Sequence, residues 1–244
     1  MVNKPFKGAG EILIRERSTG LAFDEFGNSS AFQVGVNESK ETQKDYRTVQ
    51  GGNVASISTI DDVTGTITGL SYQADTLAIA LRALVTKLDD TPVVDEPVTL
   101  VTGKHIKLNR IPNMGETFTL NDGTDDLVAG TDFIVQGSMI KLTGYSVAAG
   151  ESIAGTVSYT PKIQYKMKGL SSDTKEYEIY FNGYNLADND KPVILNIWRA
   201  KFSAATALDL ITESFGELPI EFEVLADENA VDPDNRFFEM NMAE

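Results

Sequence analysis

The chain has 244 residues, no cysteine and a formal net charge of -15 at pH 7, from 36 Asp and Glu against 21 Lys and Arg. This length allows one large β domain or two smaller ones, and the missing cysteine excludes disulfides, thiolate metal ligands and a cysteine nucleophile. The acidic surplus argues against binding nucleic acid through its phosphates, although acidity for solubility alone is an equal alternative. No signal-peptide pattern and no apolar run of membrane-spanning length occurs, which predicts a soluble chain without a membrane anchor, kept in a reducing compartment.

The first 70 residues contain the two-residue alternation of apolar and polar side chains that is typical of half-buried strands. Ile12 and Ile14 share one face of the first predicted strand, and residues 30–37 repeat the alternation more cleanly. Residues 54–69 return to it after an interruption. The N-terminal part is therefore predicted to be antiparallel β-sheet.

The interruption at residues 38–53 reads ESKETQKDYRTVQGGN, with mixed charge, two glycines and no core pattern. It is too long for a tight hairpin turn, so it predicts a projecting loop, and such loops in compact domains are usually functional or disordered. Its charges suit a complementary protein surface, and the candidate contact residues are Lys40, Glu41, Lys44, Asp45, Tyr46 and Arg47. Disorder in an isolated subunit is the alternative.

Residues 71–88, SYQADTLAIALRALVTKL, form the only long segment whose apolar side chains recur at helical spacing. One face of the predicted helix carries Leu77, Leu81, Leu84 and Leu88. The opposite face carries Asp75, Ile79 and Arg82, and the isoleucine makes that face a candidate contact surface. A helix packed on a sheet with one stray exposed isoleucine is the alternative.

A domain boundary is predicted near Asp90, because the segment LDDTPVVDEPV combines two prolines with four acids. From there to Thr160, short strands alternate with Gly, Asn and Asp turns, which predicts a small antiparallel β unit at residues 91–161. Within it, Phe133 and Val135 are predicted to pair with Leu142 and Ile140 in a hairpin. This succession of short strands and turns resembles the small β-sandwich modules of bacteriophage structural proteins.

Beyond Pro161 the chain returns to longer strands. Lys162, Lys166 and Lys168 give one predicted strand a basic face, and IEFEVLAD, with Glu221 and Glu223, is its nearest acidic match, a solvated strand face being the alternative. Residues 193–202 are apolar on both faces, which predicts a central strand. Residues 228–244 form an acidic arm in which the pair Phe237–Phe238 is predicted to dock on a neighbour.

No residue pattern indicates catalysis. His105 is the only histidine and has no patterned partner, so neither a catalytic triad nor a histidine metal site is supported, and the glycines near Lys104 and Gly8 do not form a phosphate-binding loop. We therefore predict no enzyme activity, no catalytic residue, no metal and no cofactor.

Taken in order, two strands, a charged loop, a strand, a helix and returning strands resemble the major tail tube proteins of long-tailed bacteriophages. In that family a penultimate strand with a basic residue leads through a small-residue turn into a segment similar to DDFGELELEGEV. In this chain the corresponding positions are occupied by Lys201-Phe202-Ser203 and by the later segment TESFGEL. Two N-terminal segments, GAGEILIRE and VTGTITGL, also match the family. The resemblance covers residues 1–90 and 162–227, which leaves residues 91–161 as an insertion.

The resemblance implies a mainly β fold, an antiparallel β-sandwich or barrel flanked by one α-helix, with the insertion as a β module on the outer surface. Subunits of that family form rings, usually of six, that stack into a tube around a DNA channel. By this resemblance, residues 38–53 would contact the adjacent ring, and Asp75, Ile79 and Arg82 would face a neighbouring subunit. Glu221 and Glu223 are candidate lumen acids on a net negative channel wall.

The same resemblance implies further copies of the chain, the tape measure protein and the tail terminator and distal tail proteins as partners, with DNA only in transit. It implies location in the virion after synthesis in the host bacterial cytoplasm. Two other classes stay open. One is the related tube protein of contractile secretion machines, and the other is a carbohydrate-binding or adhesin module, disfavoured because Trp198 is the only tryptophan and lies in a predicted buried strand.

Overall fold

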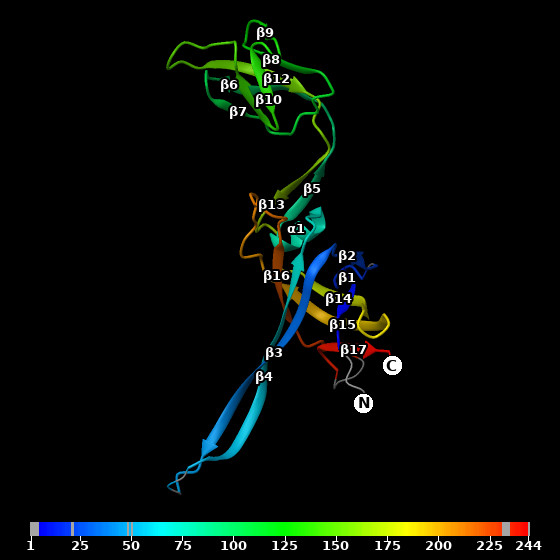
Figure 1. The fold of residues 1–244 in the computed structure, drawn as a ribbon. Coiled ribbons are helices and arrows are strands. Elements are labelled where there is room, and N and C mark those ends of the chain that lie inside the picture. The colour runs from blue at the N-terminus through cyan, green and yellow to red at the C-terminus, as the bar shows by residue number, and fades with distance from the viewer. Residues whose placement is uncertain (1–4, 21, 48, 50, 231–234, 244) are drawn as a thin grey trace. The chain divides into compact units, whose positions relative to one another are not determined.

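The computed structural model describes residues 5–20, 22–47, 49, 51–230 and 235–243. The fold is mainly β with antiparallel pairing, and the described residues contain one α-helix (Figure 1). The chain divides into two compact units. Unit 1 is Met1–Val85 with Met167–Glu244, and unit 2 is Thr86–Lys166, so the second unit is inserted into the first. The predicted limits of the insertion, 91 and 161, lie inside those of unit 2.

Unit 1 is built on one antiparallel sheet with the strand order β2-β1-β14-β15-β16-β4-β3, and β17 also pairs with β15. The strand β15 is central, since it pairs with β14, β16 and β17, as the apolar run at residues 193–202 predicts. The bounds of the strands are β1 Gly8–Glu16, β2 Asp24–Glu25, β3 Ser29–Lys44, β4 Asn53–Gly69, β14 Glu176–Asn185, β15 Lys191–Phe202, β16 Leu218–Val224 and β17 Phe238–Met242.

The sheet of unit 1 curls around its own core. Phe32 of β3 lies 5.8 Å from Phe181 of β14 and 6.1 Å from Phe222 of β16, measured between ring centroids. Strands β3 and β14 are far apart in the sheet order, so these contacts require strong curvature. Alternate residues of β16 are fully buried, as the two-residue period of the sequence predicts.

The helix α1, Ala74–Ala80, is much shorter than the predicted 71–88. It ends because Arg82 adopts a left-handed conformation with φ 46°, and the N–H groups of Arg82 and Ala83 bond back to the carbonyls of Ile79 and Ala78. This is a Schellman cap, which turns the chain out of the helix. The glycine that normally marks such a cap is absent, so the sequence pattern did not reveal it.

The residues after the helix form a strand instead. β5, Leu84–Leu88, pairs with β13, Gln164–Lys168, in a two-stranded sheet, and these strands contain the two points where the chain passes between the units. The predicted match of the β13 lysines with Glu221 and Glu223 is therefore wrong, because β16 pairs with β15 and β4. Leu84 is 53% exposed, so the predicted leucine face does not exist beyond α1.

The segment 38–53 is also not a loop over its whole length, because half of it lies in strands. Strand β3 runs to Lys44 and β4 begins at Asn53, and the pairing continues from Glu38↔Ile60 to Lys44↔Asn53. In this distal part of the β3–β4 hairpin both faces are exposed. Neither face packs on a core, so the side chains show no alternation of apolar and polar residues. The strand pairing that holds it is a backbone property, which explains why the sequence pattern predicted a loop.

Unit 2 contains two small antiparallel sheets that share one core. One has the order β6-β12-β8-β9 and the other β10-β11-β7. The predicted hairpin is confirmed, since Phe133 pairs with Leu142 and Val135 with Ile140. The strands are β6 Val93–Leu100, β7 His105–Lys107, β8 Phe118–Asn121, β9 Asp126–Leu127, β10 Phe133–Gln136, β11 Met139–Leu142 and β12 Ile153–Tyr159.

The C-terminal arm contacts its own unit. β17 pairs with β15 from Val193↔Met242 to Ile197↔Phe238. Phe237 and Phe238 are partly buried against the core of unit 1, so these rings already have partners within one copy of the chain. Burial of two aromatic rings against the same sheet removes the reason for predicting that they dock on a neighbour.

Candidate functional site

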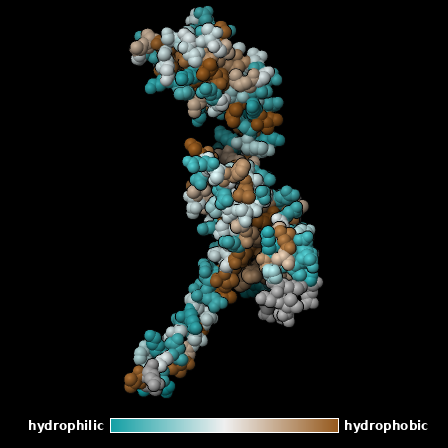
Figure 2. All heavy atoms as spheres, in the orientation of Figure 1, coloured by the Kyte–Doolittle hydropathy of each residue, from teal (hydrophilic) through white to brown (hydrophobic). Residues whose placement is uncertain are grey.

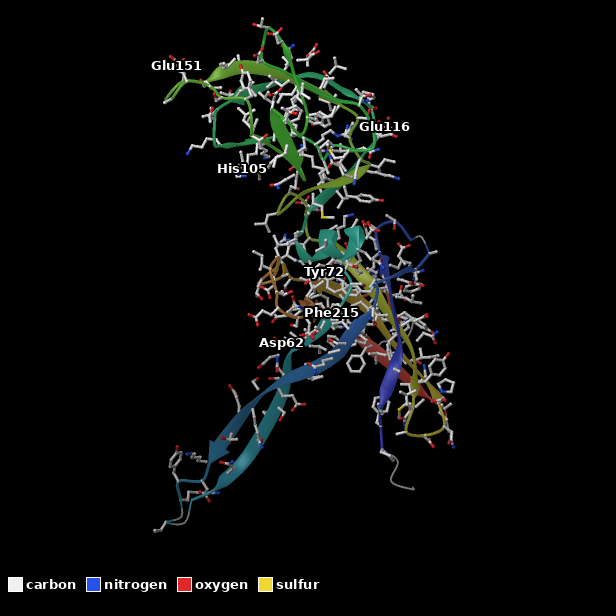
Figure 3. The ribbon with its side chains drawn as sticks, turned by 45° about the horizontal axis from the view of Figure 1, so that its top comes forward. Asp62, Tyr72, His105, Glu116, Glu151 and Phe215 are labelled. Atoms are coloured by element: carbon white, nitrogen blue, oxygen red, sulfur yellow. The ribbon has the colours of Figure 1, made fainter. Side chains whose placement is uncertain are left out.

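The most exposed surface of unit 1 is the distal part of the β3–β4 hairpin. Every described residue of β4 from Asn53 to Asp62 is exposed, and so are residues 37–44 of β3. Apolar side chains occur among them, with exposed fractions of 57% for Val54, 65% for Ile57 and 58% for Ile60. Figure 2 shows hydrophobic and hydrophilic atoms mixed along this ribbon. In Figure 3, Asp62 marks its base, where Val63 begins the buried part of β4.

The structure places the six predicted contact residues at the end of this hairpin. Lys40, Glu41 and Lys44 are exposed on β3. Asp45, Tyr46 and Arg47 follow the strand, where Tyr46 is 88% exposed and Arg47 Nε lies 3.2 Å from Asp45 Oδ1. That ion pair is local and solvated, so it leaves the surface free to contact another molecule.

The three residues predicted on the outer face of the helix line one cleft of unit 1, with a volume of about 510 Å³. Asp75 is exposed at this cleft, whereas Ile79 is half-buried and packs against the core. The prediction of an exposed Ile79 is therefore wrong. Arg82 donates a hydrogen bond from Nη2 to Thr174 Oγ1, and its buried Nε has no hydrogen-bond partner among the described residues.

Acidic side chains dominate the same cleft. Glu16 accepts a 2.7 Å hydrogen bond from Lys175 Nζ, and this bond together with one from Ser18 holds the pKa of Glu16 below its ordinary value. Asp24, Glu25 and Asp173 also line the cleft, and none of these three forms an ion pair in the described part of the chain. The cleft therefore carries an excess of negative charge.

Glu221 and Glu223, the candidate lumen acids, are both exposed on β16. In the sheet register Glu221 lies opposite Thr66 of β4, and Glu223 lies between Thr64 of β4 and Lys201 of β15. Directly opposed side chains share one face of a sheet, so this face carries both charges and hydroxyl groups. The basic neighbour of Glu223 is thus Lys201.

Two ion pairs hold strand ends together on unit 1. Arg17 donates hydrogen bonds to both carboxylate oxygens of Asp227, each 3.1 Å long, and these bonds lower the pKa of Asp227. Arg199 donates bonds of 2.9 and 2.6 Å to Glu176, which likewise lower the pKa of that carboxyl. Bidentate, charge-assisted bonds of this kind fix geometry, so they have a structural role here.

An apolar groove of about 630 Å³, which the sequence reasoning missed, also opens on unit 1. Its walls are residues 8–12 of β1 and residues 27–32 around the start of β3. Phe181, Leu195 and Met240 contribute apolar lining. In the sheet order β3 is an end strand, so its outer edge has no β partner in the described chain.

Comparison with protein-family models gives a match over residues 5–240 to a family described as "Protein of unknown function UCP028589". No curated protein matches the chain. Within the described residues, none of the helices combines the length and apolar character required to cross a membrane. No group of three or more His, Cys, Asp or Glu side chains in the described ranges is arranged to hold a metal ion.

Proposed function

The chain belongs to the family described as protein of unknown function UCP028589, and we propose that it is a structural subunit that assembles into the stacked rings of a hollow bacteriophage tail tube. In this proposal unit 1 is the tail-tube domain, and unit 2 is a module carried on the outside of the tube. The curved antiparallel sheet with one helix is compatible with the β-sandwich that the sequence resemblance implies.

The distal β3–β4 hairpin is the observation that carries the proposal. A two-stranded ribbon is at best marginally stable alone in water, and this one also exposes Val54, Ile57 and Ile60. Exposed apolar groups on a projecting element mark an interaction surface, because burying them against a partner removes them from water. A copy of the chain in the adjacent ring supplies that partner in a stacked tube.

The charge of the chain supports a conduit through which DNA passes without binding. Each copy has a formal net charge of -15, and we place some of this charge on the channel wall, with Glu221 and Glu223 as candidates. Duplex DNA carries one negative charge per roughly 1.7 Å, so a basic wall would hold it by many phosphate contacts. A negative wall keeps the DNA hydrated and mobile.

This proposal includes the partners and the location that a tail tube requires. The subunit contacts further copies of itself, most simply in rings of six. The tube contacts a tape measure protein inside it and terminator and distal tail proteins at its ends. The protein acts in the virion after synthesis in the host cytoplasm, and its role requires neither a catalytic residue nor a cofactor.

Removal of the distal hairpin tests the proposal. Replacing residues 39–59 by a short Asn-Gly turn keeps the pair Glu38↔Ile60 next to the turn and leaves the core of unit 1 intact. We expect folded subunits that form no long tubes in electron micrographs. The matched control exchanges the opposed pair Thr42→Ser and Ser56→Thr, which preserves the length and polarity of the ribbon, and should form tubes. Long tubes from the shortened chain, or no rings from the unmodified chain, would contradict the proposal.

A further inference from the structure

The segment 203–217, which connects β15 to β16, exposes large apolar side chains without forming a helix or strand. Leu210 is 82% exposed, and Ile211 and Phe215 are each 96% exposed. Its N-terminal end is fixed, since Ala205 N donates to Ala80 O and Ser203 N donates to Glu221 O. Figure 3 labels Phe215 together with Tyr72, whose hydroxyl packs against Gly216. The middle of this segment, here called the β15–β16 loop, thus presents three apolar groups to water.

All charged residues of the β15–β16 loop are acidic. Asp209, Glu213 and Glu217 are exposed, and residues 203–217 contain no Lys, Arg or His. None of the three carboxylates forms an ion pair within the described part of the chain. Long irregular loops are usually functional, and exposed apolar side chains mark interaction sites. The β15–β16 loop, which exposes both apolar and acidic side chains, therefore has the features of a protein-binding surface.

A surface of opposite character lies on unit 2. On the outward face of the β10-β11-β7 sheet, His105 is opposed by Lys141 and Lys107 is opposed by Met139, while Lys104 immediately precedes β7 (His105 is labelled in Figure 3). These strands contain no Asp or Glu, and the three lysines have no ion pair among the described residues. Ile134 and the 44% exposed Met139 add apolar area to this basic face.

The basic face is unusual for this chain. Acids outnumber bases by 15 in the whole sequence, yet one small sheet face concentrates cationic side chains and excludes anionic ones. Lys107 and Lys141 lie on neighbouring strands of this face, and these strands carry no acidic side chain to offset them, so the face attracts an anionic partner. The occupant of this face must therefore carry carboxylates or another anion, together with apolar groups that cover Met139 and Ile134.

We propose that the β15–β16 loop of one copy docks on the basic face of unit 2 of another copy. This inference rests on the proposed self-assembly and names a contact that contributes to it. The two surfaces match in both respects, since three carboxylates meet Lys107 and Lys141 of the sheet face with Lys104 next to them in sequence, and three exposed apolar side chains meet the apolar part of the face. Subunits of charge -15 repel one another, so assembly requires local contacts of opposite charge such as this one.

Two charge-reversed full-length variants test the contact. The face variant carries Lys104→Glu, Lys107→Glu and Lys141→Glu, and the loop variant carries Asp209→Lys, Glu213→Lys and Glu217→Lys. Each variant alone opposes like charges, so its self-association, measured by sedimentation and by energy transfer between labelled subunits, should weaken at least about tenfold at low salt. In an equimolar mixture, each loop meets a face of opposite charge, and association should return.

The matched control reverses three other exposed lysines near the ends of unit 2, Lys87→Glu, Lys162→Glu and Lys166→Glu. These substitutions change the net charge by the same amount as those of the face variant. This control should associate like the unmodified chain. Far-ultraviolet circular dichroism and thermal unfolding of every variant exclude loss of folding as the cause of an effect.

Every other outcome overturns the proposal. If only a chain carrying all six reversals recovers and the mixture does not, the loop contacts the face of its own chain. If the face variant associates normally but loses binding to a heparin column, the face serves a polyanion instead. If rings form normally from all variants, this contact is wrong while the proposed tube function stands; absence of rings from the unmodified chain contradicts the function itself.

Discussion

At the residue scale, the close approach of two strands in unit 1 depends on a missing side chain. A Cβ added at Gly65 of β4 would lie 2.2 Å from Phe222 Cζ and 2.5 Å from Gln33 O. Gly35, one register position along on β3, has nothing nearer than Thr64 O at 4.0 Å. The sequence alternation predicts that residue 65 faces the core, but it does not reveal that only glycine leaves room for the Phe222 ring.

We therefore predict that Gly65→Ala destabilises the protein by about 3 kcal/mol or more, because overpacking forces the Phe222 ring and the β3 backbone to move. Denaturant unfolding of the purified chain measures this change. Gly35→Ala is the matched control and should alter the free energy of unfolding by less than about 1 kcal/mol. Equal free energies of unfolding for the two variants would contradict the tight packing of the Phe222 ring against Gly65.

At the element scale, the Arg17–Asp227 pair joins the chain just after β1 to the chain just after β16. Because hydrogen bonds from Arg17 lower the pKa of Asp227, the folded carboxyl ionises at lower pH than the unfolded one. The stability from this pair is complete above the unfolded pKa, near 3.9, and is lost as the pH falls through the folded pKa.

Asp227→Asn should lower the free energy of unfolding by about 1 to 3 kcal/mol at pH 7, since it breaks charge-assisted hydrogen bonds. The difference between this variant and the unmodified chain should shrink as the pH falls from about 5 toward 2. Glu228→Gln is the control, because its side chain is exposed and accepts no hydrogen bond from the described residues. Chemical unfolding at a series of pH values checks the prediction, and a difference that stays constant down to pH 2 would contradict it.

At the scale of the whole molecule, each unit has its own buried core, centred on residues such as Phe222 in unit 1 and Phe133 in unit 2. The chain passes between the units through the paired strands β5 and β13. An inserted unit with a separate core is removable when the ends that it leaves behind are close, as in two paired strands.

Replacing residues 86–166 by a short Gly-Asn turn between Val85 and Met167 should therefore leave unit 1 folded, while its self-association should weaken because the basic face of unit 2 is lost. Circular dichroism and negative-stain microscopy measure the two properties. The expected tubes are thinner if unit 2 lies on the outside. A shortened chain that folds but forms no rings would show that unit 2 takes part in ring assembly, and would agree with docking of the β15–β16 loop on its basic face.

The elements that bury one face against a core were predictable from the sequence. The alternation at Ile12 and Ile14, at residues 63–67 and in the Phe133–Leu142 hairpin all predicted strands that the structure contains, because burial imposes a period of two on the side chains. The apolar residues 193–202 indicated a central strand for a different reason, because a strand covered on both faces carries apolar side chains without alternation.

The features that depend on backbone geometry or on distant partners could not be predicted from the sequence. The distal hairpin is held by strand pairing with both faces in water, and the end of α1 is set by a Schellman cap at an arginine, so neither leaves a side-chain period or a glycine in the sequence. The place of Lys201 beside Glu223, and the gathering of Lys107 and Lys141 on one sheet face, follow from strand register and order. Register is a property of two segments at once, and a pattern read along one segment cannot contain it.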